Sequence, residues 1–139
     1  WNQKRATDEV LKNGWLQTGD IGEIDDSGFL KITDRKKDII VNLGGDNISP
    51  SKIENILCLN ECIKQSFVYG DKKNYLVALL VVEKNMNKEE IKKILENINK
   101  QLSLIEKIKK FFLIYEEFSI NNGMLTPTLK LNFYLYLQL

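Results

Sequence analysis

The chain has 139 residues, 43% of them apolar, and a formal net charge of +1. That size suits one domain, or one small domain with a piece of another. The near-zero charge gives no electrostatic reason to expect nucleic acid as a partner. The sequence contains no histidine, which excludes Ser-His and Cys-His nucleophile systems. Any catalytic contribution must therefore come from charge and positioning.

The chain begins at Trp1 in a polar stretch without a signal peptide, so we expect a segment cut from a longer protein. No apolar run reaches the length of about 18 residues that a transmembrane helix needs. Cys58 and Cys62 are too few for a metal site in a chain without histidine, so no metal site is predicted. Reduced thiols and a cytoplasmic location are expected instead.

The first predicted element is a β-hairpin over residues 21–32, because an Asp-Asp-Ser-Gly turn at 25–28 separates two apolar runs. A charged run, Asp34–Asp38, follows the hairpin. Such a run is not expected inside a core, so we interpret it as a boundary between two packed units.

Two helix starts are marked by their capping residues. Ser49 before Pro50 is typical of an N-cap followed by a first helical residue. Asn87 with Glu90 resembles a capping box, and apolar residues then recur at helical spacing as far as Ile105.

Residues 63–69 and 75–82 predict two strands joined by a turn, and residues 111–115 predict another. The continuous apolar run of the second strand favours a central place in the sheet. After the charged run the predicted order is β, α, β, β, α, β. This order indicates a small α+β domain with helices packed on a short mixed sheet.

Three segments, in this order, resemble the adenylate-forming family of acyl-CoA synthetases, acyl ligases and luciferases. They are GWLQTGDIGEIDDSGFL at 14–30, ITDRKKDIIVNLGGDNISPSKIE at 32–54 and LTPTLKL at 125–131. The last two are most similar to the long-chain fatty acyl-CoA synthetase branch. The resemblance implies that residues 1–36 are the tail end of the large N-terminal adenylation domain, including the hairpin, and that residues 37–139 are the mobile C-terminal domain.

The resemblance implies a reaction in two steps. A fatty acid carboxylate attacks the α-phosphorus of Mg-ATP to give acyl-AMP and pyrophosphate, and the thiol of coenzyme A then displaces AMP. The C-terminal domain of the family rotates between the two steps. The implied partners are fatty acid, ATP, coenzyme A and the protein's own N-terminal domain, which would hold most of the Mg²⁺ contacts. Peripheral membrane association of the full-length enzyme is a further expectation.

Two predicted nucleotide ligands follow from matched positions in the family. Asp20 matches the carboxylate that accepts hydrogen bonds from both ribose hydroxyls, and Arg35 matches an arginine near the ribose. An ionised carboxylate offers two acceptor oxygens to a vicinal diol. The alternatives are a turn aspartate and a solvated surface charge.

Four more residues match the moving parts of the family. Lys37 falls at the hinge, Gly44 and Gly45 match glycines that approach the pantetheine arm, and Lys130 matches the catalytic lysine at the carboxylate and α-phosphate. A compact ammonium suits the charge developing there. Alternatively, both lysines belong to the general lysine excess and the glycines form an ordinary turn. The basic residues that often follow the catalytic lysine are replaced here by Leu131–Asn132–Phe133.

Two other functions remain open. Acyl-AMP ligases that load a carrier protein share the ribose aspartate and the catalytic lysine. A non-catalytic binding module could also have kept the fold. The phosphate loop and the fatty acid pocket of the family do not occur in these 139 residues, so we expect the segment to be inactive alone.

Overall fold

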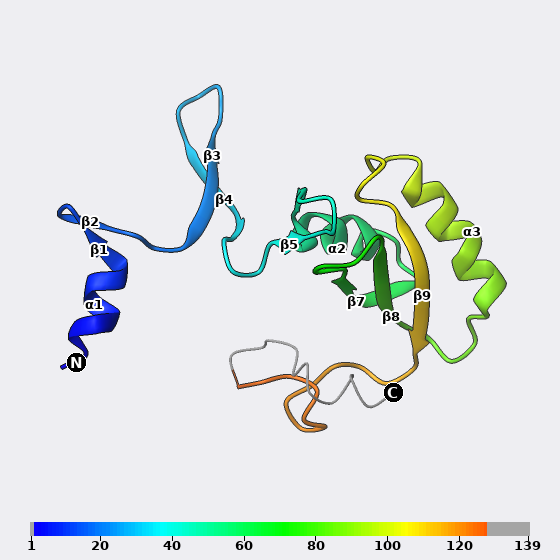
Figure 1. Cartoon of the computed structure of the whole chain (residues 1–139). Coiled ribbons are helices and arrows are strands. Elements are labelled where there is room, and N and C mark those ends of the chain that lie inside the picture. The colour runs from blue at the N-terminus through cyan, green and yellow to red at the C-terminus, as the bar shows by residue number, and fades with distance from the viewer. Residues whose placement is uncertain (1, 128–139) are drawn as a thin grey trace. The chain divides into compact units, whose positions relative to one another are not determined.

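The computed structural model describes residues 2–127, so Trp1 and residues 128–139, including Lys130, lie outside the description. The chain divides into two compact units, Trp1–Ile39 and Ile40–Leu139. This division lies three residues after the boundary expected from the sequence. In Figure 1 the first unit is coloured blue to light blue and the second runs from cyan to orange. Each unit is described by itself.

The first unit consists of one short helix and two small antiparallel strand pairs. Its elements are α1 (Lys4–Val10), β1 (Leu11–Lys12), β2 (Trp15–Leu16), β3 (Asp20–Ile24) and β4 (Leu30–Arg35). β1 pairs with β2, and β3 pairs with β4. The predicted hairpin is thus confirmed as β3–β4, whereas α1 and the β1–β2 pair were not predicted.

The turn of the β3–β4 hairpin forms for the reason that its sequence suggests. One carboxylate oxygen of Asp25 accepts hydrogen bonds from the backbone N–H groups of Ser27 and Phe29, each 2.9 Å long. Gly28 has a φ of +85°, which a side chain would make costly. The aspartate and the glycine together fix the reversal of the chain.

The first unit has almost no core of its own. Its large apolar side chains are exposed: Trp15 by 76%, and Ile24 and Phe29 by 72% each. Asp34 is the one buried residue among residues 2–39, with 8% of its surface exposed. The expectation that the charged run stays out of a packed interior does not hold for Asp34, which lies in β4 and accepts a 2.8 Å hydrogen bond from the backbone of Arg35.

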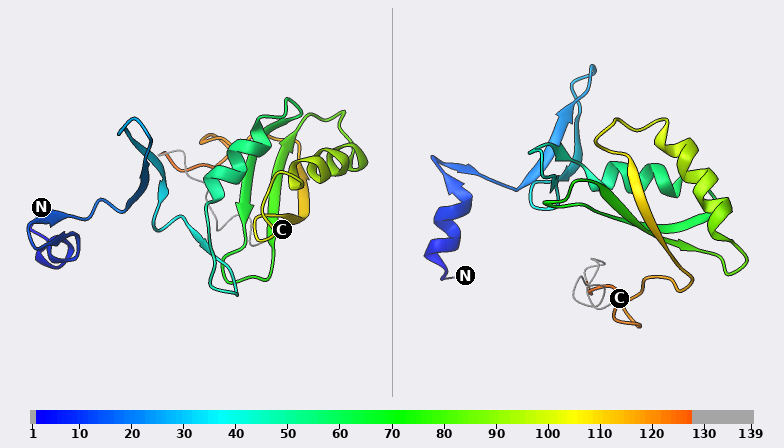
Figure 2. Two further views of the ribbon diagram at one scale, coloured as in Figure 1. Left: turned by 90° about the horizontal axis from the view of Figure 1, so that it is seen from above. Right: turned by 45° about the vertical axis from the view of Figure 1, so that its right-hand side comes forward.

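The second unit carries its helices on a three-stranded sheet. Its elements are β5 (Ile40–Val41), β6 (Asn47–Ile48), α2 (Pro50–Cys58), β7 (Ile63–Tyr69), β8 (Leu76–Val82), α3 (Lys88–Asn99) and β9 (Ile108–Ile114). The strand order is β7-β8-β9, antiparallel between β7 and β8 and parallel between β8 and β9. The connection from β8 to β9 runs through α3, as Figure 2 shows. The predicted α+β fold with a short mixed sheet is confirmed.

Both predicted helix starts are confirmed by their hydrogen bonds. The Ser49 side chain accepts from the backbone N–H of Lys52 at the start of α2, and Asn87 and Glu90 form the complete capping box of α3. The end of α3 was predicted too late. The helix ends at Asn99, whose side-chain amide bonds both backbone groups of Ile108, at 2.9 and 3.0 Å, where β9 begins.

The core of the second unit is built on β8, which the sequence correctly predicted to be central. Alternate residues of β8 join the main hydrophobic cluster together with residues of α2 and α3: Leu76, Ala78, Leu80 and Val82. Because side chains alternate across a strand, both helices cover the same face of the sheet. Val77, Leu79 and Val81 point to the opposite face.

We predict that trypsin cleaves the chain first at Lys36–Lys37 and leaves the second unit intact. That pair lies in an exposed turn next to a unit without a core, whereas the matched pair Lys92–Lys93 lies in α3 on the core. Local opening of the turn at Lys36–Lys37 should therefore need far less free energy than local unfolding of α3. Mass spectrometry of a digestion time course checks this. First cleavage at Lys92–Lys93 would show that the second unit is not independently stable.

Candidate functional site

Asp20 and Arg35 meet at the open end of the β3–β4 hairpin. They are direct partners in the strand register, and Arg35 Nε lies 2.7 Å from Asp20 Oδ1. The backbone bond from Lys36 N–H to the carbonyl of Gly19, 2.8 Å long, continues the pairing beyond the two residues. The two predicted ribose ligands are therefore brought together by the hairpin itself.

The pair keeps hydrogen-bonding capacity for a ligand. The side chain of Asp20 is 26% exposed and that of Arg35 is 54% exposed. The contact between them uses one carboxylate oxygen and one of the five guanidinium N–H groups. An aspartate held in this way can accept from a hydroxyl group, and the neighbouring guanidinium can still donate to an oxygen of the same ligand.

Lys37 lies in the turn of residues 36–38, just before the division between the two units. The turn is closed by two backbone bonds to the carbonyl of Arg35, from Asp38 at 3.0 Å and from Ile39 at 3.2 Å. The Lys37 side chain is exposed. A turn of this kind needs few broken contacts to change its φ and ψ angles, which is what a hinge requires.

Gly44 and Gly45 lie in the loop between β5 and β6, and the loop explains both locally. The side chains of Asn42 and Asp46 bond to each other at 2.9 Å across the loop. A Cβ at Gly44 would lie 3.3 Å from an oxygen of each of them. Gly45 has a φ of +85° with open space on its Cβ side. The loop therefore presents bare backbone at Gly45, held in shape by the Asn42–Asp46 contacts.

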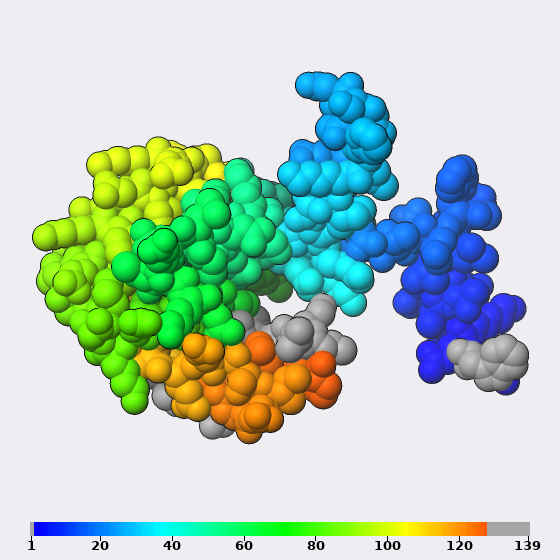
Figure 3. All heavy atoms as spheres, turned by 180° about the vertical axis from the view of Figure 1, so that it is seen from behind, coloured from blue at the N-terminus to red at the C-terminus, as the bar shows by residue number. Residues whose placement is uncertain are grey.

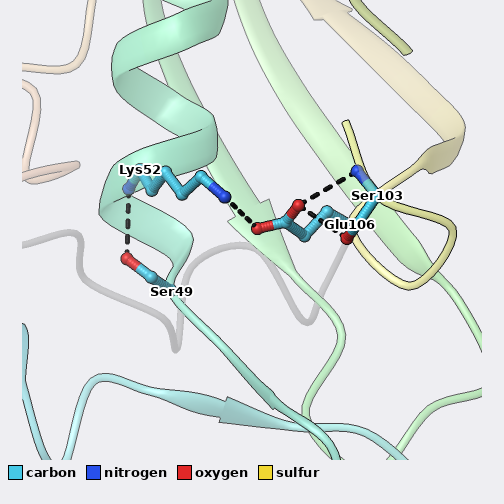
Figure 4. Close-up of polar contacts among 4 residues, drawn as sticks. All are labelled: Ser49, Lys52, Ser103 and Glu106. Atoms are coloured by element: carbon cyan, nitrogen blue, oxygen red, sulfur yellow. Dashed lines mark hydrogen bonds and ion pairs between the residues drawn. The ribbon is translucent and has the colours of Figure 1, made fainter. Parts of the chain in front are cut away.

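A polar cluster that the sequence did not predict fixes the helix that follows this loop. Lys52 Nζ lies 2.6 Å from Glu106 Oε1, and Glu106 Oε2 accepts from the Ser103 hydroxyl at 2.6 Å and from its N–H at 3.1 Å, as Figure 4 shows. Burial raises the pKa of Glu106, but the hydrogen bonds and the lysine charge outweigh it and hold that pKa below its usual value. The cluster ties the start of α2 to the loop after α3.

Lys130, the remaining predicted site residue, lies outside the described residues. No group of three or more metal-ligating side chains occurs among the residues that the structure describes. Within the same range, no helix combines the length and apolar character needed to cross a membrane.

The family model described as AMP-binding enzyme C-terminal domain matches residues 37–120. The chain belongs to this family. The match begins at the predicted hinge and covers α2, α3 and the whole three-stranded sheet. It therefore covers most of the second unit.

Relatives of known sequence extend the similarity across the first unit as well. The chain is 34% identical to the long-chain-fatty-acid–CoA ligase FadD15 of Mycobacterium tuberculosis, over 94% of this chain and 26% of that protein. It is 39% identical to the long-chain-fatty-acid–CoA ligase 5 of Rattus norvegicus, over 89% of this chain and 22% of that protein. The chain thus spans about a quarter of the length of these relatives.

Solved structures show the same fold. The O-succinylbenzoate coenzyme A synthetase of Bacillus subtilis in complex with AMP matches 94% of this chain and 25% of its own, with a TM-score of 0.72 and 30% identity. The adenylation domain of the carboxylate reductase from Mycobacterium chelonae reaches a TM-score of 0.82 over 99% of this chain and 24% of its own, at 24% identity. The latter supports the fold alone.

We predict that Glu106→Gln lowers the free energy of unfolding by about 1 kcal/mol at neutral pH, because an ion pair is lost and the lysine is half exposed. The Glu106 pKa is lowered on folding, so its stabilisation is full above about pH 4.3 and is lost as pH falls through the folded-state value. Thermal unfolding from pH 7 to pH 3 should show the difference from wild type shrinking with acidity. Glu96→Gln, at an exposed site on α3, is the control. A difference independent of pH would contradict the assignment.

Proposed function

We propose that the protein to which this chain belongs is an AMP-forming long-chain fatty acid–CoA ligase, and that the chain supplies its C-terminal domain and the end of its adenylation domain. The observation that carries the proposal is the Asp20–Arg35 pair. The two residues at the family's ribose positions lie 2.7 Å apart and remain accessible. Asp20 and Arg35 are far apart in the sequence, and they meet only because the β3–β4 register makes them direct partners.

In the proposed adenylation step, the chain's own residues bind and orient the nucleotide. Asp20 accepts hydrogen bonds from the ribose hydroxyls, and Arg35 holds that carboxylate ionised and in place. Lys130 brings an ammonium to the α-phosphate, where charge develops as the fatty acid carboxylate attacks. No proton transfer is required of these three residues, which agrees with a chain without histidine.

In the proposed thioester step, the β5–β6 loop replaces Lys130 at the reaction centre after rotation about Lys37. The bare backbone at Gly45 lets the pantetheine arm of coenzyme A pass, and the Asn42–Asp46 contacts keep the loop narrow. Coenzyme A is preferred to a carrier protein as acceptor because the relatives at 34–39% identity are named as CoA ligases. The same names support the long-chain fatty acid as substrate.

Mg²⁺ would accompany the ATP, but residues 2–127 offer no cluster of ligands for it. Its contacts would therefore lie mainly in the adenylation domain. Cytoplasmic location is also part of the proposal, supported by the two free thiols, Cys58 and Cys62. The exposed apolar side chains of the first unit fit a surface that the rest of the adenylation domain covers.

We predict that Lys130→Ala in the full-length enzyme slows adenylation by on the order of 100- to 1,000-fold, the usual effect of losing one preorganised charge contact. Thioester formation from supplied acyl-AMP should be nearly unchanged, because the lysine is remote from the thiol in that step. The two half-reactions are measured separately by pyrophosphate release and by consumption of acyl-AMP. Equal slowing of both steps would make Lys130 a structural or general nucleotide-binding residue.

The opposite pattern is predicted for Gly45→Trp, which should spare adenylation and obstruct thioester formation. Gly45→Ala is the matched control, because it imposes the same backbone strain at φ +85° but adds only one methyl group. The same two assays apply. If alanine and tryptophan impair thioester formation equally, the defect is strain in the loop and not obstruction of the pantetheine path.

We further predict that the 139-residue chain alone releases no pyrophosphate from ATP and fatty acid. It supplies the ribose carboxylate and the lysine, but neither the phosphate loop nor the acyl pocket of the family. Pyrophosphate release is compared with a Lys130→Ala chain at equal concentration. Release above that control would contradict the prediction.

A further inference from the structure

The segment after β9, residues 115–127, is the described part of the chain that leads to Lys130. It is held to the sheet by a bidentate hydrogen-bonded contact with the Gln65 side chain in β7. The Gln65 Oε1 atom accepts from the backbone N–H of Phe118 at 2.7 Å, and its Nε2 donates to the Phe118 carbonyl at 3.3 Å. The side-chain amide thereby pairs with Phe118 as a neighbouring strand would.

This contact lies on the face of the sheet that the helices leave uncovered. Gln65 is the register partner of Val81, and direct cross-strand partners point to the same face. Val81 and Phe118 are 1% and 5% exposed, yet neither belongs to the main cluster beneath the helices. Figure 3 shows the orange segment packed against green atoms of the same unit. Phe118 is therefore the apolar anchor of the segment.

A second side chain, Asn122, organises the segment beyond this anchor. Its Oδ1 accepts from the backbone N–H groups of Ser119 and Met124, both at 3.1 Å. Its Nδ2 donates to the Glu117 carbonyl at 2.8 Å and to the Glu116 carboxylate at 3.1 Å. The loop is closed by the bond from the Leu125 N–H to the Ser119 carbonyl, 2.9 Å long.

We propose that Gln65 and Asn122 are positioning residues for adenylation, which fix Leu125 as a rigid base from which Lys130 is delivered to the α-phosphate. The inference rests on the role of Lys130 in the proposed function. Lys130 follows Leu125 by five positions, and a chain of that length spans at most about 18 Å. A fixed base therefore raises the effective concentration of the lysine near the α-phosphate, whereas a released base lets the same tether sample a larger volume and slows the step that needs this charge.

The test compares Asn122→Ala with Asn121→Ala in the full-length enzyme. Asn121 is the neighbouring residue of the same type, exposed, with no side-chain hydrogen bond among the described residues. Asn122→Ala should slow adenylation by on the order of 10- to 100-fold and leave thioester formation from acyl-AMP within about twofold. Asn121→Ala should change neither. Slowing of both half-reactions by Asn122→Ala would mean a general folding defect and overturn the proposal.

A purely structural role is separated from positioning by the double variant with Lys130→Ala. If Asn122 acts through the lysine, its loss has no further effect on adenylation once the lysine is gone. An additive effect overturns the proposal. If Lys130→Ala impairs adenylation selectively but Asn122→Ala does not, this inference alone fails. If Lys130→Ala leaves adenylation unchanged, the proposed role of the lysine fails first.

Gln65→Glu provides a milder test if Asn122→Ala does not fold. Glutamate keeps the acceptor for the Phe118 N–H but cannot donate to the Phe118 carbonyl when ionised. Adenylation should fall while thioester formation and the unfolding temperature of the second unit stay close to wild type. Unchanged adenylation in a folded Gln65→Glu enzyme would contradict a positioning role for this contact.

Discussion

The burial of β8 on both faces is the constraint on which the second unit depends. One face meets α2 and α3, and Val81 on the other is almost fully buried where the Phe118 segment docks through Gln65. A strand buried in this way must be continuously apolar and must have both edges paired, which β7 and β9 provide. The loops at the edges of this framework, including the β5–β6 loop, can then carry exposed polar groups and bare backbone.

The first unit has no comparable support, and its exposed apolar side chains fit the place in an adenylation domain that we propose for it. A two-stranded hairpin is marginal in water by itself. Here the β3–β4 hairpin has exposed apolar side chains on its strands and a polar pair, Asp20 and Arg35, at its open end. Such a hairpin gains stability only when another surface covers it. That requirement agrees with a nucleotide site completed by the remainder of an adenylation domain.

The sequence predicted what depends on local chemistry and missed what depends on distant partners. The turn at Asp25, the cap at Ser49 and the capping box at Asn87 each involve residues at most four positions apart, and all three formed. Lys52 contacts Glu106 across 54 positions, and Gln65 contacts Phe118 across 53 positions. No local sequence pattern predicts contacts between residues so far apart. Asp34 was misjudged because its charge suggested solvent. The end of α3 was placed too late because the apolar spacing continues beyond Asn99, whose side chain instead pairs with Ile108 nine positions later.

The central claim is that this chain completes an enzyme that activates a carboxylic acid with ATP. The most direct measurement is exchange of labelled pyrophosphate into ATP by the full-length protein, with and without long-chain fatty acid. We predict exchange that requires the fatty acid and falls sharply in Asp20→Asn, because the ribose then loses its ionised acceptor. Failure of every tested carboxylic acid to support exchange would contradict it, and so would exchange that is equally fast in Asp20→Asn.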